Sequence, residues 1–169
     1  IDSTGNVLSS YLYEGAVNSS SRGCFLDLNG NINIIGRTPA NPFFSIPNKG
    51  GNDVFILKID ANGSVLESRT YGGSRDDNTN AAKIDSSGKI YIVGDTRIGT
   101  FEGTVTNANN TRPAGFLLIL SNDLTVQHKI FIKGLWGLAN DVEISPDGFI
   151  YVVGRINNNI PEEPFSPAY

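Results

Sequence analysis

The chain has 169 residues, of which 39% are hydrophobic and 18% are charged, with 19 glycines and 8 prolines. This composition is typical of a globular, turn-rich protein and excludes a disordered chain. The net charge is −4 and the 13 lysines and arginines are scattered, so we expect no nucleic-acid partner. No apolar run approaches the roughly 18–20 residues that cross a bilayer, so we expect no membrane insertion.

A short apolar segment that ends near a glycine occurs three times in the chain. The copies read INIIGRT at Ile32–Thr38, IYIVGDT at Ile90–Thr96 and IYVVGRI at Ile150–Ile156. A spacing of about 60 residues is long for helical repeats and fits a four-stranded β-propeller blade with generous loops. We therefore expect residues 1–169 to form a single propeller segment, with repeat units at approximately 1–58, 59–118 and 119–169.

Four strands are expected in each unit, and their burial predicts their order in the sheet. The innermost strand carries small and aliphatic residues, the second and third strands are apolar on both faces, and the outermost strand is partly polar. A sheet packed between two other sheets has this pattern because both of its faces are covered. No stretch has a convincing period of 3.6 residues, so almost no helix is expected. In chain order the expected strands are Gly23–Leu28, Ile32–Gly36, Asp53–Asp60, Val65–Tyr71, Asn80–Asp85, Ile90–Gly94, Gly115–Ser121, Thr125–Ile132, Asn140–Ser145 and a last strand from Ile150.

The middle unit, DVFILKIDANGSVLESRTYGGSRDDNTNAAKIDSSGKIYIVGDT, closely resembles the bacterial SBBP-type repeat of seven-bladed β-propellers. Both have an apolar strand, a D-x-x-G turn, a Gly-Gly pair before an acidic loop, a second D-x-x-G turn and a V-Y-V-x-G-x-T strand. The other two units keep the turns and the Val-Gly motif, which is Ile35-Gly36 in the first unit, but have Glu14-Gly15 and Lys133-Gly134 in place of Gly-Gly. The resemblance implies an all-β propeller of four-stranded antiparallel blades and an exported or cell-surface setting. It implies no enzyme activity and no cofactor.

The number of blades leaves three interpretations open. Closed propellers have 4 to 8 blades. Here two complete units run roughly from Ser20 to Tyr71 and from Asn78 to Ile132, with an outer strand before them and two inner strands after them. The interpretations are a segment of a longer propeller, self-assembly in which copies complete one another's sheets, and an open arc of three units.

The candidate ligand-binding residues lie on the long connections, which antiparallel order gathers at one end of the sheets. Trp136 is a candidate for stacking on a sugar ring, with filling of the gap between blades as the alternative. Arg37, Asp95 and Arg155 occupy one aligned position after the Val-Gly motif. They are expected either to ring a ligand channel or to link neighbouring blades.

An acidic loop supplies the remaining candidates. Asp76 and Asp77 are tentative ligand-binding residues, and with Asn78 they form a candidate calcium site because oxygen atoms are the ligands that Ca²⁺ prefers. The loop lacks the D-x-D-x-D-G spacing of a dedicated calcium loop, so a solvated acidic turn is the alternative. No other metal site is expected. Cys24, the single cysteine, replaces a small inner-strand residue and is expected to be buried.

No catalytic signature is found in the chain, so we expect it not to be an enzyme. The expected function is that of a non-catalytic extracellular or cell-surface β-propeller that acts as a protein-interaction or adhesion scaffold. Two alternatives are carbohydrate binding through the long-loop end and a structural role in a larger surface assembly or fibre. The expected partners are proteins or glycans at the cell surface, or further copies of the chain.

Overall fold

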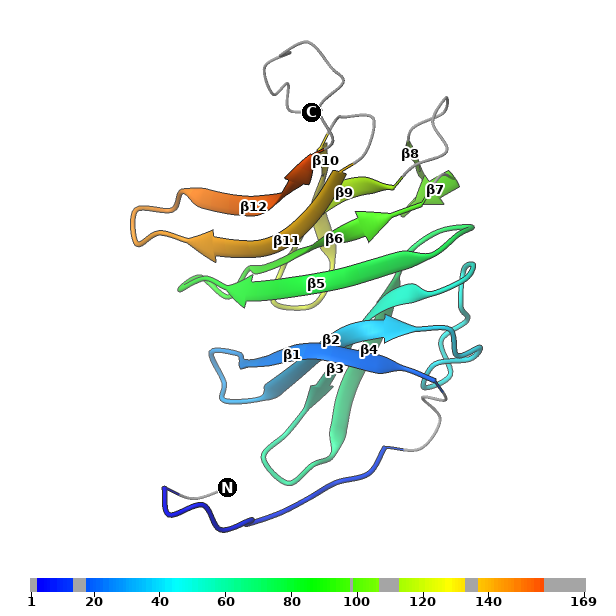
Figure 1. The fold of residues 1–169 in the computed structure, drawn as a ribbon. Helices are drawn as coiled ribbons and strands as arrows, with labels where there is room; N and C mark the ends of the chain where they lie inside the picture. The colour runs from blue at the N-terminus through cyan, green and yellow to red at the C-terminus, as the bar shows by residue number, and fades with distance from the viewer. Residues whose placement is uncertain (1–2, 14–17, 98, 107–112, 133–136, 157–169) are drawn as a thin grey trace.

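A computed structural model describes residues 3–13, 18–97, 99–106, 113–132 and 137–156 (Figure 1). The described residues form antiparallel sheets and contain no helix, and therefore none that is long and apolar enough to cross a membrane. The expectations of an all-β fold and of four-stranded antiparallel sheets are confirmed. Sheet 1 consists of β1 (Ser20–Leu26), β2 (Ile32–Thr38), β3 (Asp53–Ile59) and β4 (Val65–Tyr71) in that order.

Sheet 2 repeats this order with an insertion. It consists of β5 (Asp77–Ile84), β6 (Ile90–Thr96), β9 (Ala114–Leu120) and β10 (Val126–Ile132). Sheet 3 contains β11 (Gly137–Ile144) and β12 (Ile150–Ile156), which pair as β5 and β6 do. A small hairpin, β7 (Gly99–Phe101) and β8 (Thr104–Thr106), lies within a connection that was expected to be loop.

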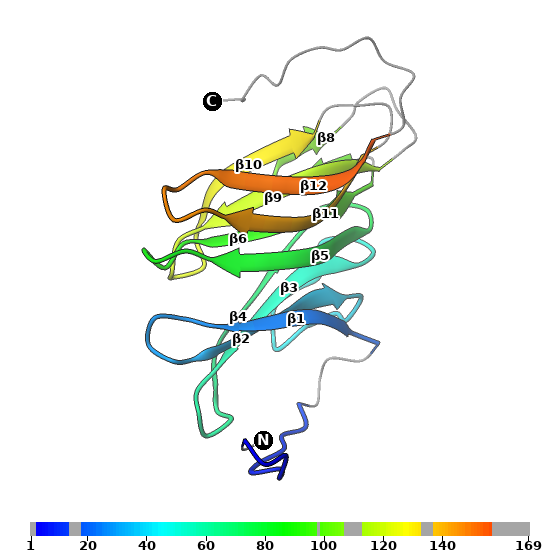
Figure 2. The ribbon, with the colours of Figure 1, turned by 60° about the vertical axis from the view of Figure 1, so that its left-hand side comes forward.

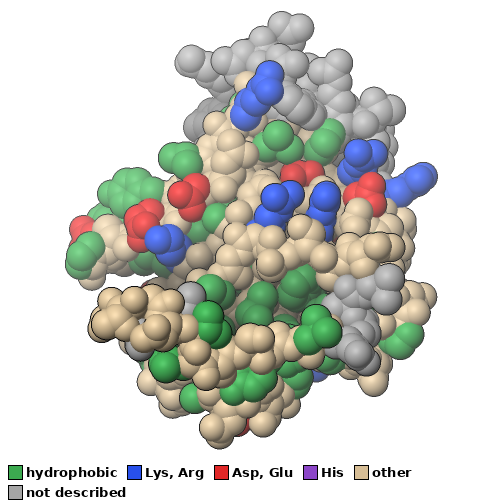
Figure 3. Space-filling model, turned by 60° about the horizontal axis from the view of Figure 1, so that its bottom comes forward, with side chains coloured by type: hydrophobic (Ala, Val, Ile, Leu, Met, Phe, Trp, Pro, Cys, Tyr) green, Lys and Arg blue, Asp and Glu red, His purple; other side chains and the backbone are tan. Residues whose placement is uncertain are grey.

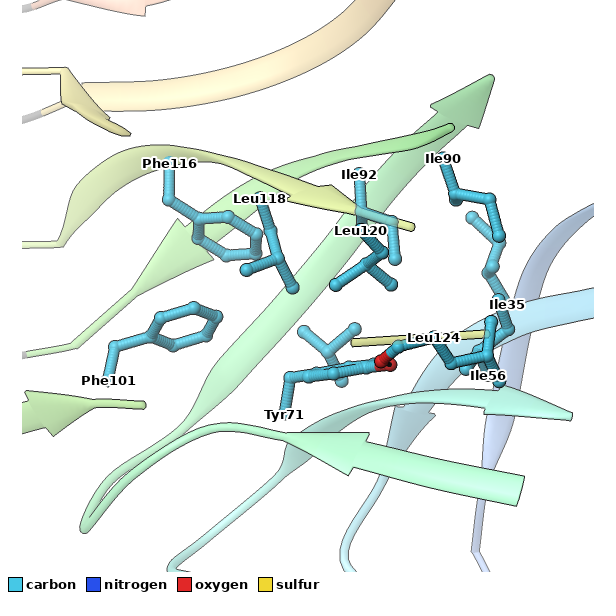
Figure 4. Close-up of a cluster of buried hydrophobic side chains, with 11 residues drawn as sticks. Ile35, Ile56, Tyr71, Ile90, Ile92, Phe101, Phe116, Leu118, Leu120 and Leu124 are labelled. Carbon is cyan, nitrogen blue, oxygen red and sulfur yellow. Dashed lines mark hydrogen bonds between the residues drawn. The ribbon is translucent and has the colours of Figure 1, made fainter. Parts of the chain in front are cut away.

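Sheet 2 lies between sheets 1 and 3, so that the three sheets form a stack (Figures 1 and 2). Successive side chains of a strand point to opposite faces, and both faces of β6 and β9 are apolar. Ile92 and Leu118 of sheet 2 form one buried cluster with Ile56 of sheet 1 (Figure 4). Val93 and Leu117 pack against sheet 3. The run of apolar residues in these strands is therefore explained by burial on both sides.

Two sheet faces are turned away from sheet 2, one at each end of the stack. We call the face of sheet 1 the first face, and it carries Phe55, Leu57 and Ile59. We call the face of sheet 3 the last face. Val152 packs toward sheet 2, so its neighbours Tyr151 and Val153 belong to the last face.

Aspartates cap the short turns at one end of the sheets. Asp27, Asp60 and Asp85 each accept hydrogen bonds at Oδ1 from the backbone N–H groups two and four residues further along, at 2.8–3.0 Å. The D-x-x-G motif thus has a local structural role, because its carboxylate satisfies turn N–H groups that no strand partner reaches. The long connections lie at the opposite end.

Some sequence-based boundaries and burial expectations differ from the structure. Asp53 pairs with Thr38, and Ala114 pairs with the equivalent Thr96, so Asp53 aligns with Ala114 and not with Gly115. Cys24 was expected to be buried and is exposed. Cys24 pairs with Ile34, which packs on the first face, so the Cys24 side chain lies on that face, where no further sheet covers it.

The glycine of the recurring apolar motif has one cause in all three sheets. A Cβ atom at Gly94 would overlap the carbonyl oxygen of Asn78 on the neighbouring strand. Gly36 and Gly154 meet the equivalent carbonyl oxygens in their own sheets. Each glycine lies beside a register shift in the inner strand, which brings the two backbones unusually close.

Replacement of Gly94 by Ala is expected to lower the free energy of unfolding by about 1–3 kcal/mol, the usual cost of overpacking. The methyl group has no space unless β5 and β6 separate. Chemical denaturation monitored by far-UV circular dichroism measures the change.

Gly23→Ala is the matched control, because nothing lies within 4 Å of a Cβ atom at that position. It is expected to leave the stability nearly unchanged. Equal stability of the Gly94→Ala protein and the wild type would show that the close approach of β5 to β6 is not a constraint.

Candidate functional site

A chain of polar side chains links sheets 1 and 2 at the end that carries the long connections. Arg37 on β2 donates from Nη1 to Oδ1 of Asn78 on β5, at 2.9 Å. Asn78 in turn donates from Nδ2 to Oδ2 of Asp95 on β6, at 3.1 Å. Only the Arg37–Asn78 bond crosses between the two sheets, because the Asn78–Asp95 bond lies within sheet 2. Arg155, the third of the aligned residues, lies on sheet 3, on the other side of sheet 2 from Arg37.

Asp76 holds the segment before β3 close to the acidic loop. Its Oδ1 accepts hydrogen bonds from the backbone N–H of Asn52 at 3.0 Å and from the Asn52 amide at 3.1 Å. Its Oδ2 lies 3.6 Å from Nε of Arg97, which follows β6. Both carboxylate oxygens of Asp76 therefore have partners within the protein.

Asp77 is buried next to a second carboxylate that the sequence analysis did not select. Asp77 and Asp53 have 1% and 0% of their surface exposed. Both approach Gly72: a Cβ atom there would overlap Oδ1 of Asp53 and lie 2.8 Å from Oδ2 of Asp77. Two acidic side chains thus occupy one buried region between sheets 1 and 2.

Each of these two carboxylates has one oxygen that is hydrogen-bonded and one that is not. Asp77 accepts at Oδ2 from the N–H of Gly73 at 2.8 Å, and Asp53 accepts at Oδ2 from the N–H of Lys49 at 2.7 Å. Oδ1 of Asp53 and Oδ1 of Asp77 are buried and have no hydrogen-bond partner. Buried polar atoms without a partner are costly, so these two oxygens need an explanation.

The hairpin β7–β8 brings a third acid to the same region. The Glu102 carboxylate accepts a hydrogen bond from the N–H of Gly72 at 2.8 Å, and the Glu102 N–H donates to the Gly72 carbonyl at 2.9 Å. The Glu102 carboxylate also pairs with the Lys49 ammonium group. Around the Gly72–Gly73 pair there are therefore three carboxylates, those of Asp53, Asp77 and Glu102. The ammonium group of one lysine, Lys49, pairs with the last of them.

The electrostatics of the buried pair follow from this arrangement. Burial raises the pKa of Asp77 to about 7, although the nearby Thr96 side chain and the Gly73 N–H lower it, and the nearby Asp53 raises it further. Burial also raises the pKa of Asp53, with the Glu102 charge acting in the same direction. Ionisation of both acids is disfavoured because two like charges share a site away from water.

The residues that the sequence proposed as a calcium site do not share a single set of partners. Asp76 bonds to Asn52, Asp77 to Gly73, and Asn78 to Arg37 and Asp95. Within the described part of the chain, no three His, Cys, Asp or Glu side chains converge as a metal cage. Trp136, the candidate for sugar stacking, lies outside the described residues, so that assignment stays a prediction from the sequence.

Sequence reasoning missed Asp53 and Glu102, although the middle unit carries a signal for them. Asp53 was interpreted only as the start of a strand, and the Gly-Gly pair only as a feature of the repeat. Glycine at position 72 is required because the Asp53 carboxylate occupies the space of a side chain. Such a glycine, with an acid at the start of a buried strand, indicates a close polar contact.

We expect the free energy of unfolding to fall as the pH rises from about 4 to about 7 in a metal-chelating buffer. The raised pKa of Asp77 means that the folded protein holds this proton more tightly than the unfolded chain, where the pKa is near 3.8. One such group contributes a slope of at most about 1.4 kcal/mol per pH unit. Urea denaturation at a series of pH values measures it.

The Asp77→Asn variant is expected to have a shallower dependence over the same pH range, because its amide does not ionise. Asp76→Asn, which changes the neighbouring acid, is the control and is expected to keep the wild-type slope. If the Asp77→Asn and wild-type slopes coincide, the proton on Asp77 is not what links stability to pH.

Comparison with known proteins assigns no family to the chain. No protein-family model matches it, and no curated protein matches its sequence. What the protein does has therefore to be inferred from the packing of its sheets and from the polar groups buried between them.

Proposed function

We propose that this chain forms blades of a β-propeller of the SBBP type and acts as a non-catalytic protein-interaction scaffold at the cell surface. Its interaction surfaces are the two end faces of the stack, and the partner is a sheet of the same repeat supplied by a second copy. The support comes from the equivalence between the end faces and the faces that pack together inside the chain.

The exposed last face is the observation that carries this proposal. Tyr151 and Val153 on β12 are 58% and 60% exposed. The equivalent residues of β6, Tyr91 and Val93, are 7% and 0% exposed because sheet 3 covers them. Two large apolar side chains on a regular sheet face are a typical mark of an interaction surface.

The edge of β12 supports the same conclusion. β2 and β6 each have a second neighbour in the sheet, which is the fully buried strand β3 or β9. Among the described strands, β12 pairs only with β11. Its backbone can therefore accept another strand by β-augmentation, as exposed sheet edges do.

The first face is built as the matching half of the interface. Phe43, from the connection after β2, lies against Phe55 with ring centroids 4.7 Å apart. Phe101 and Phe116 make the equivalent pair at 4.7 Å, and that pair lies between sheets 1 and 2. The first face thus repeats the packing of sheet 2 against sheet 1, although the chain itself already buries Phe43 and Phe55 there. Figure 3 shows hydrophobic side chains exposed at this end of the molecule.

The chemistry of the described residues supports a non-catalytic role. His128, the single histidine of the chain, is exposed on the outer strand β10. The acid with the most strongly raised pKa, Asp77, is buried and cannot reach a substrate in solution. A general acid or base must lie within hydrogen-bond reach of the group it serves.

Replacement of both Tyr151 and Val153 by Glu is expected to weaken self-association by about tenfold or more. Burial of one large apolar side chain contributes about 1.5–3 kcal/mol, and each added carboxylate would lose its hydration in the interface. Sedimentation velocity over a wide range of protein concentration measures the association constant of each protein.

Val105→Glu is the control, because Val105 is exposed on the hairpin strand β8 and belongs to neither end face. It is expected to associate like the wild type. The proposal is wrong if the wild type sediments as a monomer throughout, or if the double variant associates as strongly as the wild type.

A further inference from the structure

The buried carboxylates between sheets 1 and 2 present two orphaned oxygens and no side-chain cation of their own. Lys49 donates its backbone N–H to Asp53, but its ammonium group pairs with Glu102. Arg97 pairs with Asp76. Lys49 and Arg97 are thus engaged with other acids, and Asp53 and Asp77 share one buried environment.

We propose that Asp53 and Asp77 bind a Ca²⁺ ion beside Gly72, between sheets 1 and 2. Calcium takes hard oxygen ligands, and carboxylates and backbone carbonyls are its usual ones in proteins. An ion here would satisfy the buried oxygens that have no hydrogen-bond partner, Oδ1 of Asp53 and Oδ1 of Asp77. It would also relieve the repulsion between the two acids.

The spacing of the oxygens agrees with a bridging ion. Oδ1 of Asp53 and Oδ2 of Asp77 both lie within 2.8 Å of the position that a Cβ atom at Gly72 would take. The two carboxylates therefore approach one point, and Ca²⁺ bonds to oxygen are about 2.3–2.6 Å long, so one ion can bridge these carboxylates through their unpartnered Oδ1 atoms. Glycine at position 72 lets the two carboxylates approach each other, because the side chain of any larger residue would overlap Asp53.

The next sheet junction provides an internal comparison. Ala114 occupies the position of Asp53, and Gly137 occupies the position of Asp77. There the N–H of Gly137 donates to the carbonyl of Pro113 at 3.1 Å, and backbone contacts fill the region. Both acids are present between sheets 1 and 2, and both are absent between sheets 2 and 3. Two sheets of this repeat can therefore pack together without either acid.

We choose calcium as the ion because the side chains at this site supply only a few of the oxygen ligands that a metal ion needs. The described residues supply two buried carboxylates but no cage of three acidic or imidazole side chains. Backbone carbonyls and water must therefore complete the coordination. Ca²⁺ accepts 6–8 oxygen ligands in flexible geometry, whereas Mg²⁺ demands a near-ideal octahedron. The site differs from the sequence-based set of Asp76, Asp77 and Asn78 because only Asp77 is common to both.

Thermal unfolding at pH 7.5 with EGTA, and then with about 10 mM CaCl₂, tests the site. For a dissociation constant of about 1 mM, as in extracellular calcium modules, the Tm of the wild type is expected to rise by about 3–6 °C. Asp53→Asn and Asp77→Asn are each expected to abolish the rise. Asp76→Asn is the control of equal charge change and is expected to keep it.

Sodium chloride at matched ionic strength separates binding from screening. The proposal is overturned if NaCl raises the wild-type Tm as much as CaCl₂ does, or if the Asp53→Asn and Asp77→Asn variants respond to Ca²⁺ like the wild type. A wild-type Tm that does not change with Ca²⁺ overturns it as well.

Terbium luminescence tests the wild type alone and does not depend on whether a variant folds. Tb³⁺ replaces Ca²⁺ at oxygen sites, and Tyr71 lies next to Gly72 and can transfer excitation to it. We expect sensitised emission that Ca²⁺ displaces and equimolar Mg²⁺ displaces at least tenfold less well. Emission that Ca²⁺ does not displace contradicts a specific site.

Discussion

The burial of both faces of sheet 2 is the interaction on which the rest of the structure depends. Side chains that alternate along β6 and β9 enter two separate clusters, one shared with sheet 1 and one shared with sheet 3. A fully buried aliphatic side chain contributes about 1.5–3 kcal/mol, and these strands supply several to each cluster. Within each sheet, the inner strand bulges toward its neighbour and requires a glycine there, as at Gly94. The recurring Val-Gly motif is thus a packing motif, and the loops beyond it are free to differ.

This mode of packing has a consequence for the ends of the stack. A sheet that is apolar on both faces is satisfied only between two neighbours, so each end sheet retains one apolar face. The chain covers part of the first face itself, with Phe43 and Tyr13 packed against it. The last face keeps Tyr151 and Val153 in solvent. The proposed scaffold role rests on this recurrence, because the side-chain pattern that stabilises the interior is found again on both end faces.

The polar groups at the long-loop end are arranged differently from those at the short-turn end. At the short turns each aspartate has backbone N–H donors of its own chain segment, as Asp85 has. At the long-loop end Asp53 and Asp77 meet across a junction between two sheets, and each keeps one oxygen without a partner. Burial of such acids opposes folding unless a proton or a cation neutralises them. A structural repeat that tolerates this cost at one junction and omits both acids at the next has a polar site that packing alone does not explain.

The amino-acid pattern alone predicted the strands of the three stacked sheets and their order, because alternation and turn residues act over a few positions, but it missed the hairpin β7–β8. The aligned positions of Arg37 and Asp95 also suggested either a link between blades or a ligand channel, and of these two residues Arg37 is the one that bonds to the next sheet. Tertiary structure was needed for the pairing of Asp53 with Asp77, which lie on different sheets and become neighbours only when the sheets stack. It was also needed for the exposure of Cys24, because a residue type predicts burial only where another sheet covers its face. Local patterns thus determine each sheet, whereas contacts between sheets depend on register and on which faces meet, and no local pattern encodes these.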